Sequence, residues 1–464
     1  MAKKKENTLE EKLQEALVPE NQWPYILPEN WCWTRLGKIT NIVGGGTPSS
    51  SKKEYYDNGT IPWLSPADLS GYSDIYISRG QKNITELGLS KSSARLMPKD
   101  TVLLSSRAPI GYVAIASNSI STNQGFKNFL PSDAFYSRFL YWYLKSSKSL
   151  LESYASGTTF LELSGSKASM VEFPLPPLPE QKRIVHRIES LFAKLDEAKE
   201  KIQQVLDGAE MRKAAILHKA FTGELTKNWR KENGISDDTW VTKKLCETEI
   251  DIIDGDRGKN YPKKDEFSND GYCVFLNAKN VTKTGFQFEN IQYITQEKDE
   301  LLRKGKLKRG DIVLTTRGTI GNIALYDDSI PFDDMRINSG MVIYRYGESF
   351  YGPYIIWLYR SPFIIKQYSL LQTGSAQPQL PIKDMRNLQL SIPCIEEQKC
   401  IAKLLDDFAM INVNIVEKCN KVISDIDVMK KSILAKAFRG ELGTNNPTED
   451  SALNLLKEVL QDKF

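Results

Sequence analysis

Histidine is the residue that this chain has least of. Only His186 and His218 occur among its 464 residues, and both fall in one predicted helix. The six cysteines form no Cys-x-x-Cys pair, so the sequence predicts no zinc or other metal site and no disulfide framework. Two histidines also leave little for general acid–base chemistry.

Long apolar runs are absent too. No stretch approaches the roughly 20 apolar residues that a membrane-spanning helix needs, and no apolar segment follows the basic start at residues 1–6. We therefore expect a cytoplasmic protein. The net charge of +4 is compatible with a nucleic-acid partner without indicating one. A hydrophobic content of 41% over 464 residues is enough for two or three cores.

Catalytic motifs are missing as well. Gly44-Gly45-Gly46 lacks the Gly-Lys-Ser/Thr ending of a P-loop, so a flexible turn is the stronger interpretation. The sequence has no Asn/Asp-Pro-Pro-Tyr/Phe box of an amino-methyltransferase and no convincing nuclease constellation. The enzyme hypothesis is therefore weak, although scattered carboxylates could still build a catalytic site.

What the chain does contain is a long internal repeat. Residues 176–225 recur at 393–442 without a gap, and subtracting 180 from 397 gives the constant offset of 217. Both copies start with Pro-x-x-x-Glu-Gln-Lys and finish with Ala-Phe-x-Gly-Glu-Leu. A repeat of this length indicates a duplicated structural unit.

Each copy is predicted to form one long helix, running in the first copy from Glu180 to Thr222 over roughly 60 Å. Apolar residues follow one another at alternating steps of four and three, the spacing of a coiled-coil seam. In the first copy they are Ile184, Ile188, Leu191, Leu195, Ala198, Ile202, Val205 and Ala209, and in the second Ile401, Leu405, Phe408, Ile415, Val422 and Ile426. Gly223 and Gly440 are expected to end the helices. The obvious partner of one helix is the other. The alternative is that each is an ordinary core helix, in which the polar residue Asn412 of the seam only fixes the register of packing.

A globular segment precedes each helix. Short strand-like runs and a helix from about Phe135 to Tyr154 predict a compact α+β domain in the first segment. The second repeats this plan, since 105–107 matches 315–317 and 123–125 matches 338–340. The loops at 44–49 and 255–260 differ almost completely. The two domains are therefore predicted to share a frame but not a surface.

The predicted fold is α+β with a pseudo-twofold internal repeat: two similar globular α/β domains are separated by two long helices that form an antiparallel coiled coil. The expected parts, in chain order, are an N-terminal helical segment at 1–27, domain 1 at 28–178, a central long helix at 179–227, domain 2 at 228–392, a distal long helix at 393–442 and a C-terminal tail at 443–464. A short helix is expected in that tail from Ala452 to Phe464, capped by Asp450 or Ser451.

The doubled motifs resemble those of the specificity subunits of type I restriction-modification systems. The resemblance covers almost the whole chain and includes the framework positions Arg107/Arg317 and Gly157/Gly374. It implies two target-recognition domains that each read one half of an asymmetric, split DNA site, with the helices setting the spacer. It also implies that this chain has neither catalytic activity nor a cofactor.

By the same resemblance, two methyltransferase subunits would supply adenine-N6 methylation with S-adenosylmethionine, and endonuclease subunits would use ATP and Mg²⁺. The helix faces outside the seam and the pairs Ala220-Phe221 and Ala437-Phe438 are expected to dock such partners. Two alternatives stay open: a non-catalytic coiled-coil scaffold that binds only proteins, and a nonspecific DNA binder.

Reading double-stranded DNA needs side chains that present hydrogen-bond donors and acceptors to base edges. The contacts expected in domain 1 are Thr47, Ser49, Lys52, Lys53, Arg107, Asn123 and Gln124. Those expected in domain 2 are Arg257, Lys259, Asn260, Lys263, Lys264, Arg303, Lys304, Lys306, Arg317, Gln377 and Gln379. The run at 303–309 suits phosphate neutralisation. A solvated basic surface is the alternative, and the shared position of Arg107 and Arg317 suits a phosphate contact or a structural role better than base reading.

Overall fold

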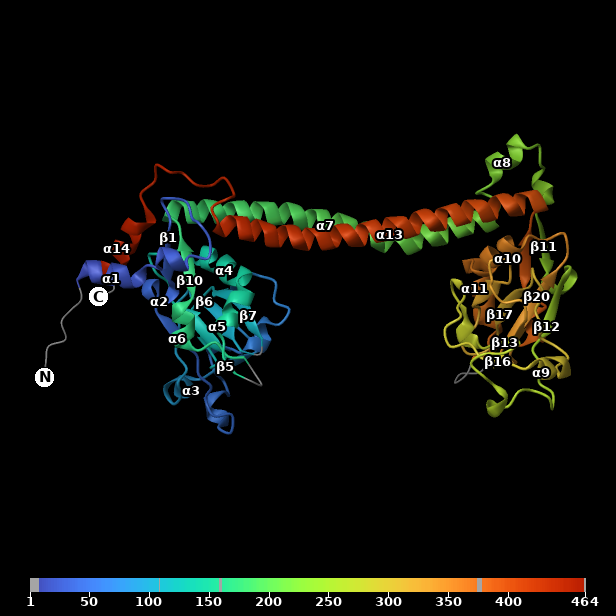
Figure 1. Cartoon of the computed structure of the whole chain (residues 1–464), viewed down its shortest axis with the longest axis horizontal. Helices are drawn as coiled ribbons and strands as arrows, with labels where there is room; N and C mark the ends of the chain where they lie inside the picture. The colour runs from blue at the N-terminus through green and yellow to red at the C-terminus, as the bar shows by residue number, and fades with distance from the viewer. Residues whose placement is uncertain (1–7, 108, 158–160, 374–377, 463–464) are drawn as a thin grey trace. The chain divides into compact units, whose positions relative to one another are not determined.

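The protein is described by a computed structural model that covers residues 8–107, 109–157, 161–373 and 378–462 (Figure 1). The chain forms two compact units: Met1–Lys201 with Lys421–Phe464 is unit 1, and Ile202–Asn420 is unit 2. Within the described ranges, no helix is both long enough and apolar enough to cross a membrane.

Unit 1 is built on a five-stranded sheet in the order β2-β9-β6-β7-β4, accompanied by the sheet β5-β3-β8 and the pair β1-β10. The central strand β6 is buried on both faces, because Val102 and Leu104 join one hydrophobic cluster while Leu103 joins another. The strands are β1 (Cys32–Arg35), β2 (Ile42–Gly44), β3 (Ile61–Leu64), β4 (Tyr76–Ile77), β5 (Lys82–Ile84), β6 (Val102–Ser106), β7 (Ile110–Ala116), β8 (Ser121–Thr122), β9 (Phe126–Phe129) and β10 (Glu172–Leu175).

The helix predicted from Phe135 to Tyr154 is wrong in its continuity, because the structure divides it at Ser147. The hydroxyls of Ser146 and Ser147 both donate to the Tyr143 carbonyl, at 2.8 and 2.7 Å, and such back-bonding competes with the helical ladder. The α-helices of unit 1 outside the coiled coil are α1 (Leu9–Ala16), α2 (Leu36–Ile39), α3 (Glu86–Ser90), α4 (Ser137–Ser146), α5 (Lys148–Tyr154), α6 (Gly165–Met170) and α14 (Ala452–Asp462).

Unit 2 repeats this plan. Its main sheet has the order β12-β20-β17-β18, and beside it lie the sheet β16-β13-β19 and the pairs β11-β21 and β14-β15. The strands are β11 (Val241–Lys244), β12 (Ile250–Asp254), β13 (Cys273–Leu276), β14 (Val281–Thr282), β15 (Gly285–Phe286), β16 (Tyr293–Ile294), β17 (Ile312–Thr315), β18 (Ile323–Leu325), β19 (Met335–Ile337), β20 (Met341–Tyr346) and β21 (Gln389–Ile392). The shorter helices are α8 (Lys227–Glu232), α9 (Gln296–Leu301), α10 (Gly352–Tyr359), α11 (Pro362–Leu371) and α12 (Ile382–Met385).

The two predicted long helices are confirmed. They are α7 (Leu178–Phe221) and α13 (Ile395–Phe438), each of 44 residues. Gly223 and Gly440 follow them with φ of 78° and 74°, the left-handed backbone that a C′ glycine accepts without strain. In unit 1 the helices run antiparallel, since Lys199 lies 3.4 Å from Asp427 while Lys430 pairs with Asp196.

The predicted seam is only partly buried. Ile184 and Ile188 of α7 and Ile401 and Leu405 of α13, near the helix starts, are fully buried or nearly so. Farther along, Ala209 and Ile426 are also buried, whereas Val205, Ile415 and Val422 are 41%, 37% and 44% exposed. Each helix start packs into the core of its own unit. The globular parts therefore anchor the helices as much as the seam does.

The expectation that Ala220-Phe221 and Ala437-Phe438 form docking surfaces is wrong. All four residues are buried, and Phe221 packs against Tyr354 while Phe438 packs against Phe139 and Tyr143. An aromatic ring that fills a core has no face left for another subunit. The repeated Ala-Phe motif is therefore a core anchor.

The repeated Glu-Gln-Lys motif also has a structural role. Gln181 accepts a hydrogen bond from the Tyr136 N–H at 2.8 Å and donates to the Ala134 carbonyl at 3.0 Å. Gln398 does the same with the Tyr351 N–H and the Ser349 carbonyl, both at 2.9 Å. Each glutamine therefore fixes a long helix to the segment that precedes α4 or α10.

Candidate nucleic-acid interface

Three segments meet at one edge of the main sheet of unit 2: the loop after β12, the turn before β20 and the end of β17. The Thr316 N–H donates to the Gly340 carbonyl at 2.8 Å, and the Arg257 guanidinium donates to the Ser339 carbonyl at 3.3 Å. A Cβ on the buried Gly255 would collide with the Asn338 carbonyl, so the loop requires glycine there.

The same edge recurs in unit 1. The Ser106 N–H donates to the Gly125 carbonyl at 2.8 Å, and the Gly46 N–H donates to the Thr122 carbonyl at 2.9 Å. A Cβ on Gly45 would collide with the Asn123 carbonyl. A Cβ on Gly46 would likewise collide with the Ala94 backbone, so these two glycines are explained by close approach of backbone without a bound phosphate.

The predicted contacts Asn123 and Gln124 both have protein partners in unit 1. The Asn123 side-chain oxygen accepts from the Gly125 N–H at 2.8 Å, as that of Asn338 accepts from Gly340 at 2.9 Å in unit 2. Gln124 accepts from the Thr47 hydroxyl. These bonds give both asparagines a role in shaping a turn, and their contact with DNA stays a prediction.

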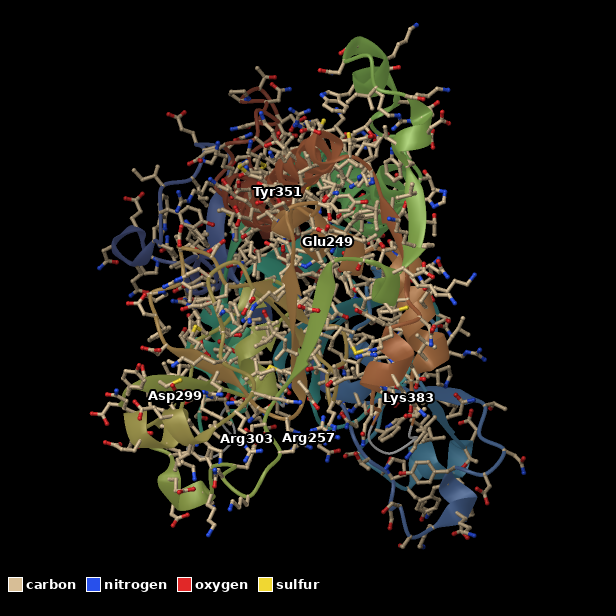
Figure 2. All side chains as sticks on the ribbon, turned by 90° about the vertical axis from the view of Figure 1, so that its right-hand side faces the viewer. Glu249, Arg257, Asp299, Arg303, Tyr351 and Lys383 are labelled. Carbon is tan, nitrogen blue, oxygen red and sulfur yellow. The ribbon has the colours of Figure 1, made fainter. Side chains whose placement is uncertain are left out.

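Asp256 joins the two basic loops of unit 2. Its carboxylate accepts the N–H groups of Gly258 and Arg303, both at 2.8 Å. Against the effect of burial, these backbone donors hold the pKa of Asp256 below its usual value. The Asn260 side chain donates to the Leu301 carbonyl at 3.1 Å across the same gap. Figure 2 shows Arg257 and Arg303 at one end of unit 2 and Tyr351 and Glu249 toward the other.

The basic run at 303–309 divides into structural and free cations. Lys306 pairs with Asp299 at 2.5 Å and Asp334 at 2.6 Å, and Arg309 pairs with Asp333 at 2.9 Å. No side-chain partner occurs among the described residues for Arg303, Lys304 or Lys308. The free cations of this surface also include Lys259, Lys263 and Lys264, whose side chains are largely exposed.

Buried Arg336 holds the backbone of this run in place. Its Nε donates to the Asp299 carboxylate at 2.7 Å, and its Nη1 donates to the Lys304 carbonyl at 2.6 Å. Because Lys306 binds the same aspartate, the backbone of the run is fixed from two sides. The exposed cations Arg303 and Lys304 are thus carried on an ordered backbone.

At the equivalent sheet edge of unit 1, the loop at 44–53 borders a cavity instead of a cluster of exposed cations. Thr47 and Lys53 line a cavity of about 550 Å³ together with Trp63, Lys82 and Asn83. Nearby, Lys52 lies over the Tyr55 ring at 5.3 Å, and the Ser49 hydroxyl is 2.9 Å from that of Ser51. Lys82 and Asn83 were missed from the sequence because they lie on β5, remote from the glycine-rich loop, and carry no motif.

The shared arginines have equivalent backbone pairings but different side-chain surroundings. The backbone of Arg107 pairs with that of Glu162, and the backbone of Arg317 pairs with that of Gln379. The Arg107 side chain lies 3.9 Å from Glu162, a long ion pair on a half-exposed side chain, whereas Arg317 is exposed. Gln377 and Gly374 lie outside the described residues, so the structure adds nothing to the expectations for them. In the described ranges no group of three His, Cys, Asp or Glu side chains could hold a metal ion.

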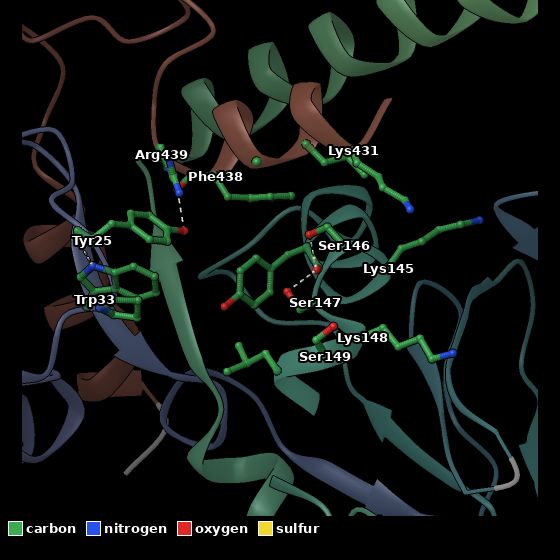
Figure 3. Close-up of a pocket in the computed structure, with 15 residues that line it drawn as sticks. Tyr25, Trp33, Lys145, Ser146, Ser147, Lys148, Ser149, Lys431, Phe438 and Arg439 are labelled. Atoms are coloured by element: carbon green, nitrogen blue, oxygen red, sulfur yellow. Dashed lines mark hydrogen bonds between the residues drawn. The ribbon is translucent and has the colours of Figure 1, made fainter. Parts of the chain in front are cut away.

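A second basic cavity, of about 670 Å³, lies beside the end of α13 in unit 1 (Figure 3). Trp33, Tyr143 and Phe438 contribute aromatic walls, and Arg439 lies over the Tyr25 ring at 5.4 Å. Its other cations are Lys145, Lys148 and Lys431. Burial lowers the pKa of Lys145, whose ammonium donates to the Tyr141 hydroxyl at 2.8 Å. This cavity is assembled from segments far apart in the sequence, so no local pattern predicted it.

Comparison with known proteins places this geometry in context. The chain matches the family described as "Type I restriction modification DNA specificity domain" over residues 28–207 and 238–424. It is 32% identical to the type I restriction enzyme MjaIX specificity subunit of Methanocaldococcus jannaschii, over 90% of this chain and 94% of that protein. It is 24% identical to the EcoBI specificity subunit of Escherichia coli, over 94% and 93% of the two chains.

A solved structure has a similar fold. The crystal structure of the HsdS subunit from Thermoanaerobacter tengcongensis matches with a TM-score of 0.62 and 18% identity, over 91% of this chain and 100% of that chain. Similarity at this level of identity concerns the fold alone. It supports the architecture of two α/β domains with two long helices.

Proposed function

Because this chain belongs to the family of type I restriction enzyme specificity subunits, we propose that its two domains read two different halves of one split DNA site. Members of this family are non-catalytic DNA-recognition subunits, and this chain is one of them. The asymmetric target and the assignment of one half to each domain are the proposed refinements. They state that unit 1 and unit 2 each read a different half of the site.

One observation carries the proposal: the same sheet edge is built twice with different chemistry on it. The backbone bonds Ser106–Gly125 and Thr316–Gly340 are equivalent. The loop beside the first presents Thr47 and a hollow, whereas the loop beside the second presents Arg257 and free lysines. Equivalent frames dock on DNA in similar ways, and different side chains select different bases.

The phosphate contacts are proposed separately from the base contacts. Arg303 and Lys304 are exposed cations on a strongly basic run, which suits neutralisation of DNA phosphates. Arg107 and Arg317 occupy one shared frame position and suit the same use. Base reading is assigned to the loops at 44–53 and 255–264, because these differ between the units.

Partner subunits are proposed to bind the exposed faces of α7 and α13. The family indicates methyltransferase and endonuclease partners in general, and we propose two methyltransferase subunits, one for each copy of the repeat. S-adenosylmethionine, ATP and Mg²⁺ would bind those partners, and this chain would need no cofactor. We further propose that the complex works in the cytoplasm and that α7 and α13 set the spacer between the half-sites.

The test is selection from a randomised duplex library by this chain co-expressed with its cognate methyltransferase subunit, at several salt concentrations. We expect two short, different motifs separated by a fixed gap. Uniform weak binding with a steep salt dependence would indicate a nonspecific DNA binder. An assembled complex without DNA binding would indicate the protein-only scaffold.

A further inference from the structure

A pocket of about 380 Å³ lies in unit 2 between α10, the end of α7 and the first half of α13. Its apolar lining includes Ile216 and Leu217 of α7, Trp357 of α10, and Leu405 and Ala409 of α13. Leu217, Trp357 and Leu405 are buried, while Ile216 and Ala409 are partly exposed. The pocket is therefore an open apolar recess with a tryptophan wall.

Unit 1 has the same frame, but there a ring fills the recess. The Trp142 indole donates to Glu189 at 3.2 Å, as the Trp357 indole donates to Asp406 at 2.8 Å in unit 2. The Phe192 ring packs edge-on against Trp142 at 5.1 Å. The repeat offset of 217 places Ala409 at the position of Phe192. Unit 2 therefore lacks the ring at 409, although Phe408, which stands where unit 1 has Leu191, lines the pocket beside that position.

The charged residues around this position also differ between the two units. In unit 1 Lys430 pairs with Asp196 and lies over the Phe192 ring at 5.1 Å. The counterpart of that lysine is Lys213, and the counterpart of Asp196 is Val413; both line the pocket. Among the described residues Lys213 has no anionic partner. Its ammonium is an unpaired cation at the rim.

Arg360 contributes a second cation with an unused donor. Its Nε is buried and has no hydrogen-bond partner, its Nη2 is 3.5 Å from the Ile323 carbonyl, and its guanidinium lies over Trp357 at 5.7 Å. Lys283 on the β14–β15 turn adds a third, exposed cation. The one acidic residue of the lining, Asp406, accepts the Trp357 N–H and interacts electrostatically with Arg360. It offsets one of the three cations, so the lining keeps a net positive charge.

Three apolar residues of α13 replace charged residues of α7. Leu404, Ile411 and Val413 stand where the repeat has Arg187, Lys194 and Asp196, and they are 39%, 57% and 57% exposed. Leu404 and Ile411 lie two turns apart on one face of the helix, whereas Val413 lines the pocket itself. The replacement of Asp196 by Val413 therefore removes an acidic group from the pocket of unit 2.

We propose that this pocket binds an acidic segment of a partner protein that carries one bulky apolar side chain. The apolar group occupies the recess at Ala409 against Trp357, and the flanking carboxylates face Lys213, Lys283 and Arg360. The inference rests on the proposed docking role of the helices and makes it asymmetric. Phe192 fills the equivalent place in unit 1, so a partner engages unit 2 through a contact that unit 1 does not offer.

The test is fluorescence polarisation of labelled dodecapeptides with the full chain. The probe has one phenylalanine flanked by glutamates, and its controls replace the phenylalanine by alanine or the glutamates by lysines. We expect the probe to bind at least tenfold more tightly than either control. Ala409→Phe should weaken binding of the probe at least tenfold, and Lys213→Glu at least fivefold. Phe at 409 is compatible with folding because unit 1 carries Phe192 there, and circular dichroism checks this.

The matched control is Ala193→Phe, which adds the same ring to an exposed position of α7 in unit 1 and should leave binding unchanged. Equal affinity for the phenylalanine and alanine peptides, or unchanged binding by Ala409→Phe, would overturn the proposal. Site selection on DNA is read separately with the same variants. Failure of DNA recognition would therefore be distinguishable from failure of this docking site.

Discussion

Two equivalent glutamates, Glu180 and Glu397, are buried in opposite electrostatic settings. Glu180 accepts the Trp31 indole N–H at 2.9 Å, and burial raises its pKa above the usual 4.5 against that hydrogen bond and nearby Arg183. Glu397 instead binds the Arg230 guanidinium at 2.6 Å, and both side chains are almost fully buried. One copy of the motif thus holds a carboxyl group whose pKa is raised by burial, while the other holds a glutamate paired with a buried arginine.

Glu180→Gln and Glu397→Gln should therefore have different effects. A carboxyl group whose folded pKa is raised stabilises the fold fully below its unfolded pKa, and this contribution is lost as the pH rises through the folded value. Glu180→Gln should leave unit 1 within about 1 kcal/mol of the wild type at pH 7.5 or stabilise it, and it should flatten the pH dependence above pH 4.5. Glu397→Gln should destabilise unit 2 by about 3 kcal/mol, because it leaves a buried arginine without its closest anion.

Calorimetry at several pH values tests both substitutions, since two units can unfold in separate transitions. Each variant serves as the other's control, because the replaced residue and its repeat position are the same. Equal destabilisation by the two variants at pH 7.5 would contradict the different roles of the two glutamates.

Lys304 and Lys306 are two residues apart but differ in role. Lys304→Ala should lower the slope of log affinity against log salt by about 1 and leave stability unchanged, because its ammonium is free to meet a phosphate. Lys306→Ala should destabilise unit 2 by about 2 kcal/mol, because the buried Asp299 then keeps only Arg336 as a cation. Salt titrations of DNA binding and thermal unfolding measure the two effects. A large stability loss in Lys304→Ala would show that it is structural.

At the scale of elements, the long helices were the most predictable part of the fold. Heptad spacing of apolar residues and a terminal glycine are local patterns that predict a helix, and both patterns occur in each copy of the repeat. The break at Ser147 was missed, because it depends on two hydroxyls bonding to the Tyr143 carbonyl rather than on a proline or glycine. Helix ends that carry Ala-Phe were misassigned because sequence does not separate a core ring from an exposed one.

The candidate interface was predictable only in part for a related reason. Loops 44–53 and 255–264 were found because they differ between two otherwise similar frames. Lys82 and Asn83 join Thr47 and Lys53 only through the pairing of β3 with β5. The pairing of Lys306 with Asp299 and Asp334 was not foreseen, because a basic run gives no sign of which cations have buried partners, and its contact with DNA stays a prediction. Both features depend on long-range strand pairing and on burial, which a local sequence pattern does not show.

The spacer role of α7 and α13 gives a prediction about elements. Seven residues inserted after Gln204 and after Lys421, equivalent positions of the repeat, keep the seam in phase and add about 10 Å to each helix. If the helices set the spacer, the tolerated gap should grow by about three base pairs of 3.4 Å. Selection of sites from a library with variable gaps measures this. An unchanged gap would contradict the spacer role, and insertion into one helix alone is the control for mismatched seams.

At the scale of the whole molecule, the duplicated frame makes the two recognition domains separable. Each sheet edge is closed by bonds within its own unit, such as Ser106–Gly125 and Thr316–Gly340. The helix anchors are also internal, because Gln181 binds the segment before α4 and Gln398 the segment before α10. A domain that carries its own frame and its own anchor should keep its sequence preference when it is moved.

Replacing residues 228–392 with the matching segment of a relative should therefore change one half of the selected DNA site. The other half should stay the same, because the loop at 44–53 and its backbone bond to Thr122 are untouched. The reciprocal exchange of residues 28–178 is the control and should alter the opposite half. Library selection reads both exchanges in one assay. If either exchange altered both halves, recognition would be a property of the joined pair, and the division of the target between the two domains would be wrong.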